Sequence, residues 1–100
     1  MADQLFIFAG RGVASEPSGY RSGARHPLMV FATAANFEAA VAAAAEFATL
    51  AGWLDLEFTK GEVSLEPALL PNDQLKAAAE RALEVGHAMV VYQTEITPRP

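Results

Sequence analysis

The sequence predicts an α+β domain of the ferredoxin-like type, with a βαββαβ core and an added strand at its N-terminus. Three observations lead to this prediction. Short runs of aromatic and β-branched residues indicate strands, two alanine-rich stretches with apolar residues at helical spacing indicate helices, and a glycine follows each of these stretches. In the ferredoxin-like plan, both helices pack on one face of an antiparallel sheet.

The N-terminal part of the chain predicts two strands joined by a long connection. The run LFIFA at 5–9 is rich in residues that favour strands, and LMVFAT at 28–33 is a second run of this kind. The segment between them, 10–26, contains four glycines, three serines and a proline, which is the composition of a loop. We therefore expect a 17-residue loop between the two strands.

The first helix is expected at about 36–51. Asn36 is a favourable N-cap, and Gly52 is a favourable residue just beyond the last turn. Residues 53–65 then alternate between apolar and polar side chains around a Lys-Gly pair. This alternation predicts a β-hairpin with a two-residue turn.

The C-terminal part predicts a second helix and a last strand. The helix is expected to follow Asn72 and to end at Gly86, and the strand to cover 88–96, AMVVYQTEI. Residues 97–100 are expected to form a frayed tail. The strand at 5–9 is then an addition to the ferredoxin-like core, at an edge beside the last strand. The alternative is that the strands at 5–9 and 28–33 form a plain hairpin, which would require another strand order.

Composition and charge narrow the class of protein. A chain of 100 residues that is 52% hydrophobic predicts one folded domain over 1–100. The net charge of −5 argues against nucleic-acid binding, which normally needs a basic surface. Cysteine is absent, and no apolar run is long enough to span a membrane. We expect a cytoplasmic protein with no membrane partner and no cofactor.

The loop at 10–26 is a candidate anion-binding site. It carries Arg11, Arg21, Arg25 and His26 and only one acidic residue. Guanidinium groups suit carboxylates and phosphates, and a loop of this length is often functional. The glycine spacing does not match a phosphate-binding or dinucleotide-binding loop, and a strand rather than a helix follows. The competing interpretation is an ordinary solvated loop.

The polar face of the predicted hairpin is a candidate surface for a protein partner. Its register places four carboxylates on one side, Asp55, Glu57, Glu62 and Glu66. Such a patch suits a basic partner. The alternative is that these charges protect an edge strand from pairing with other chains.

Catalytic and metal-binding signals are weak. The two histidines, His26 and His87, lack the spacing of a metal site, so no metal is expected. None of the serines lies in a G-x-S-x-G context. No catalytic residue is identified, and a binding role is favoured over an enzymatic one.

If both helices pack on one face of the predicted sheet, the other face stays uncovered. The strands at 5–9 and 28–33 are apolar on both faces, so the open face needs a cover. Either the 10–26 loop folds back over it with Val13 and Tyr20, or a second subunit covers it, and we favour the second subunit. The sequence therefore favours a small homodimeric binding or regulatory module that engages a protein through the acidic hairpin or the 10–26 loop. The alternative is a ligand-binding or enzymatic dimer that holds a small anion with the loop arginines.

Overall fold

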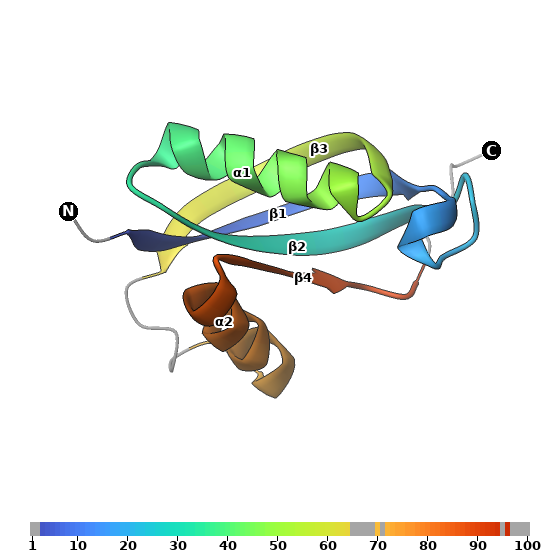
Figure 1. Cartoon of the computed structure of the whole chain (residues 1–100). Coiled ribbons are helices and arrows are strands. Elements are labelled where there is room, and N and C mark those ends of the chain that lie inside the picture. Colours follow the sequence, from blue (N-terminus) through green and yellow to red (C-terminus); the bar gives the residue numbers. More distant parts are fainter. Residues whose placement is uncertain (1–2, 65–69, 71, 95, 97–100) are drawn as a thin grey trace.

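The computed structural model describes residues 3–64, 70, 72–94 and 96 and shows a four-stranded antiparallel sheet with two helices (Figure 1). The strand order in the sheet is β3-β1-β2-β4. The elements are β1 (Gln4–Ala14), a short 3-10 turn (Glu16–Ser18), β2 (Arg25–Ala34), α1 (Phe37–Leu50), β3 (Trp53–Ser64), α2 (Asp73–Val85) and β4 (His87–Val91). The predicted α+β class is confirmed, but the ferredoxin-like strand order and the added N-terminal strand are not.

The two helices lie on opposite faces of the sheet, one above and one below it in Figure 1. Phe6 and Phe8 belong to the core cluster that contains the buried alanines of α1. The alternating residues Leu5 and Ile7 belong to a second cluster with α2. The expectation that both helices share one face is therefore wrong. The physical reason is that β1 is apolar on both sides, so each side needs a cover.

The capping predictions are confirmed. The side chains of Asn36 and Asn72 accept hydrogen bonds from the backbone N–H of Ala39 and Leu75, each at 2.8 Å. Gly86 ends α2 with a φ of 102°, a left-handed conformation that favours glycine. The alanine-rich α1 brings its backbone close to the sheet because its buried face consists of small side chains, Ala40, Ala44 and Ala48.

The connection between the first two strands is shorter than predicted. β1 continues to Ala14 and β2 begins at Arg25, so the loop at 10–26 shrinks to residues 15–24. Gly10 and Gly12 lie within β1. The backbone of β3 lies close to Gly10, and the side chains of Leu56 and Trp53 occupy the space beside Gly12. At Gly10, an added Cβ would collide with the carbonyl oxygen of Glu57.

The predicted hairpin at 53–65 is instead one continuous strand. β3 pairs antiparallel with β1 along its whole length, with register shifts at two points. Gly61 is not a turn residue, because it lies within β3 and pairs with Phe8 of β1. An added Cβ at this position would lie 2.6 Å from the ring of Phe8. The long β1 offers a partner for all of β3, so the chain does not need to fold back on itself.

The last strand is an edge strand. β4 pairs antiparallel with β2, and within the described part of the chain no strand lies on its other side. As expected, this pairing places His26 and His87 at opposite ends of the sheet. None of the described helices is long and apolar enough to cross a membrane.

Candidate functional site

The predicted anion-binding residues do not form one cluster. Arg11 and Arg25 lie on the face of the sheet that carries α2, because they alternate along their strands with residues of the α1 face. His26 points to the opposite face and is only 2% exposed. Arg21 is exposed in the connection between β1 and β2. Anion binding by the three arginines stays a prediction, but His26 is not beside Arg11 and Arg25.

Arg11 is already engaged by a carboxylate. Its Nη2 and Nε atoms donate hydrogen bonds to Glu57 at 2.9 and 3.2 Å, across the β1–β3 pairing. This contact holds the pKa of Glu57 below its ordinary value of 4.5, with a smaller contribution from the charge of Arg25. The pair reduces the positive charge that Arg11 offers to an external anion.

The Glu57 pair predicts a small pH dependence of stability. Because the folded state lowers the pKa of Glu57, its stabilisation is present above pH 4.5 and is lost as the pH falls through the folded value. We expect Glu57→Gln to lower the free energy of unfolding slightly at pH 7, since both partners are exposed to solvent. The free energies of unfolding of the two proteins, measured by urea titration, should converge as the pH falls well below 4.5. A constant difference across this range would assign the loss to the substitution itself rather than to the charge.

His26 serves as a core residue. A carbonyl only accepts, so Nδ1 of His26 carries the proton and donates to the Tyr92 carbonyl at 2.9 Å. The imidazole packs against Tyr20 and Trp53, with ring centroids 4.9 and 5.6 Å away. Its Nε2 atom has no hydrogen-bond partner among the described residues. The side chain thus ties the 15–24 connection to the end of β4.

The predicted acidic surface lies along β3. Asp55, Glu57 and Glu62 are exposed on this strand, whereas Glu66 falls outside the described residues. Asp55 has a φ of 48° beside one of the register shifts, so the carboxylates do not follow a regular alternation. The described residues contain no group of three or more side chains that could hold a metal ion.

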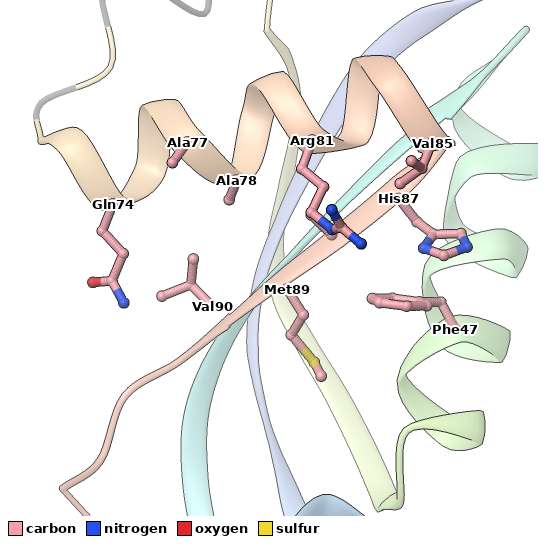
Figure 2. Close-up of a pocket in the computed structure, with 10 residues that line it drawn as sticks. Phe47, Gln74, Ala77, Ala78, Arg81, Val85, His87, Met89 and Val90 are labelled. Carbon is pink, nitrogen blue, oxygen red and sulfur yellow. The ribbon is translucent and has the colours of Figure 1, made fainter.

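A groove of about 480 Å³ lies along β4 (Figure 2). Its walls come from α2, from β4 and from Phe47 of α1. Since α1 and α2 lie on opposite faces of the sheet, a groove lined by both runs along the free edge of β4. Its polar side chains are Gln74, Arg81 and His87, and its other lining residues are Ala77, Ala78, Val85, Ala88, Met89 and Val90.

The backbone of β4 presents unpaired hydrogen-bonding groups to this groove. The N–H of Tyr92 donates to Pro27, and the N–H of Thr33 donates to Gly86, each at 3.0 Å. Antiparallel bonds alternate along a strand, so the even-numbered residues of β4 bond to β2. The odd-numbered residues of β4 are His87, Met89 and Val91, and their N–H and C=O groups point away from β2.

The two edges of the sheet differ in chemistry. β3, at one edge, carries several charged side chains and has two register shifts against β1, which disfavour pairing with another strand. β4 has the sequence HAMVV, without a carboxylate, lysine or arginine, and its register against β2 is regular. The free edge of β4 is therefore better suited than that of β3 to pair with another strand.

Side chains frame the free edge from both sides. The ring of His87 stacks on Phe47 with centroids 4.0 Å apart and an angle of 26° between the planes. Arg81 extends from α2 toward the groove in Figure 2, and none of the described residues that line the groove is a carboxylate. Sequence reasoning missed this site, since nothing in AMVVYQTEI says which edge of the strand stays unpaired.

Comparisons of the chain with protein-family models, curated proteins and solved structures return no match.

Proposed function

We propose that this chain is a protein-binding module that takes up an extended segment of a partner protein as an additional strand beside β4. The observation that carries the proposal is the groove along the free edge of β4, where the backbone groups of His87, Met89 and Val91 turn outward. In strand addition, main-chain hydrogen bonds supply affinity, and pockets for alternate side chains supply specificity.

The side chains around the edge define the class of segment. The lining is mainly apolar, so alternate residues of the segment should be apolar. Among the described residues that line the groove, Arg81 is the one with a guanidinium group, and none carries a carboxylate to pair with it. A segment with an aspartate or glutamate beside Arg81 would supply that partner.

Binding through the groove is favoured over anion binding by the loop arginines. The Arg11 guanidinium already faces Glu57, and His26 lies on the other side of the sheet. The groove instead combines unpaired backbone groups, apolar walls and one cation in one place.

The proposal is tested with a displayed library of random peptides of about ten residues, long enough to pair along β4. We expect the selected peptides to alternate apolar residues and to contain a carboxylate. On binding a selected synthetic peptide, the amides of His87, Met89 and Val91 should become protected from hydrogen exchange. The amides of Ala88 and Val90, which already bond to β2, should change little.

Two variants test separately the backbone hydrogen bonds of β4 and the charge of Arg81. Met89→Pro removes an outward N–H without removing a bond to β2, so we expect peptide affinity to fall about tenfold or more while the fold remains. Arg81→Glu should lower the affinity for peptides with a carboxylate by a similar factor. It should raise the affinity for the same peptides with lysine in place of the carboxylate. Leu83→Glu, at a half-exposed position of α2 outside the groove lining, is the matched control and should change neither affinity.

Two outcomes would contradict the proposal. One is a set of selected peptides that bind Met89→Pro as well as they bind the native chain. The other is concentration-dependent protection of the three outward amides in the protein alone, which would show that a second copy occupies β4.

A further inference from the structure

A second surface of the sheet lies beyond the reach of α2. The cluster beneath α2 includes Leu5 and Ile7 at the start of β1, but no residue of β1 after them. In Figure 1, α2 lies beneath the other end of the sheet, away from the turn at Glu16–Ser18. We call this region, which neither described helix covers, the open half-face. We define it by Arg11, Val13, Leu54, Glu57 and Tyr92, with Met29 at its border, where it packs against the cluster beneath α2.

The strand register places these side chains together. Arg11 pairs with Glu57 and Val13 pairs with Leu54 across β1 and β3, so all four share a face. Met29 pairs with Ala9 of the same face, and the Tyr92 hydroxyl donates to its sulfur at 3.3 Å. Leu54 and Tyr92 are 50% and 40% exposed, so large apolar side chains lie in solvent beside an ion pair.

The open half-face carries both signs of charge. The Arg11–Glu57 pair is exposed, with 41% and 52% of the two side chains accessible. Arg25 adds a second positive charge on the same face, near enough to act on Glu57. A partner surface of one sign would repel either the arginines or the glutamate, whereas a surface with the same pair in reverse order would match both.

We propose that the open half-face binds a second copy of this chain in a twofold-symmetric contact. A twofold axis brings the same patch from both copies together, so Arg11 of one copy faces Glu57 of the other. The two ion pairs then form a ring of alternating charges, and Leu54 and Tyr92 supply the apolar contact around it. Fully hydrogen-bonded charge networks tolerate burial better than an isolated pair does.

Charge reversal with mixing tests this contact. Arg11→Glu leaves two carboxylates at the pair, and Glu57→Arg leaves two guanidinium groups. We expect the native chain to sediment with twice the mass of one chain at micromolar concentration, and each variant alone to sediment as a monomer. An equimolar mixture of the two variants should regain the dimer, because opposite charges now meet across the interface.

Two further variants keep the test independent of the ion pair. Leu54→Asp should give a folded monomer, since Leu54 is half exposed and lies within the patch. Leu50→Asp, at a position of α1 that is 77% exposed on the other side of the sheet, is the control and should stay dimeric. Circular dichroism confirms the fold of each variant.

A monomeric native chain would overturn the proposal, as would a dimer that persists in Leu54→Asp. A dimer that survives Leu54→Asp but is lost in Met89→Pro would place the contact at β4. The peptide experiment at β4 uses different residues, so the failure of one proposal leaves the other standing.

Discussion

Trp53→Ala is expected to lower the free energy of unfolding by about 3–5 kcal/mol, the range for removing a buried tryptophan or phenylalanine. Trp53 is 1% exposed and contacts Tyr20 and His26, with ring centroids 5.6 Å away in both cases. Truncation would leave a cavity where the 15–24 connection meets the sheet. For a domain of this size, the loss is a large part of a total stability of about 5–15 kcal/mol.

Urea denaturation followed by far-ultraviolet circular dichroism measures this loss without relying on tryptophan emission. Trp53→Phe, which keeps an aromatic ring in the cavity, should cost clearly less than Trp53→Ala. Leu50→Ala serves as the exposed comparison and should change stability by less than about 0.5 kcal/mol. If Trp53→Ala and the native chain unfold at the same urea concentration, the aromatic cluster does not stabilise the domain as inferred.

Gly10→Ala is expected to cost about 3 kcal/mol, because overpacking in a rigid site costs roughly 1–3 kcal/mol and occasionally more. The added Cβ would meet the backbone of Glu57 and lie 2.9 Å from the Cα of Phe58. Backbone atoms cannot rotate away as a flexible side chain can, so β3 would have to move off β1.

Gly19→Ala is the matched control for Gly10→Ala. Gly19 has a φ of 80° and no atom within 4 Å of an added Cβ, so only its backbone conformation opposes the substitution. We expect a loss of about 1 kcal/mol at Gly19. Hydrogen exchange should show faster opening of the β1–β3 bonds in Gly10→Ala only. Equal losses at both positions would mean that the close approach of the strands is not the cause.

The helices could be predicted from the sequence because local signals define them. Asn36 and Asn72 are caps that act within one turn, and Gly86 adopts the left-handed conformation that a helix end favours. These features need no knowledge of the rest of the fold. The α+β class follows from them and from the apolar runs.

The strands were harder to predict because glycine occurs both in turns and at close contacts within a sheet. Gly10, Gly12 and Gly61 suggest a loop and a turn when the sequence is considered locally. In the structure, each lies in a strand where a neighbouring backbone or side chain fills the place of its own side chain. Nothing within a few residues distinguishes a turn glycine from one at a close strand contact.

The candidate site depends on topology and so could not be predicted from residue type. Arg81 and His87 are distant from Phe47 along the chain, and they share a groove only because β4 takes the edge beside β2. Of the predicted residues, Arg11 and Glu57 do meet, but as partners rather than as members of separate anion-binding and acidic surfaces.

The unequal edges of the sheet limit how this chain can assemble. A fibre of stacked sheets needs two complementary edges on each subunit, so that every added copy exposes a new place for the next. Here β4 is receptive, whereas the charges and register shifts of β3 oppose pairing. If two copies joined through β4, the only edges left in the described part of the chain would be those of β3, and growth would end with this pair.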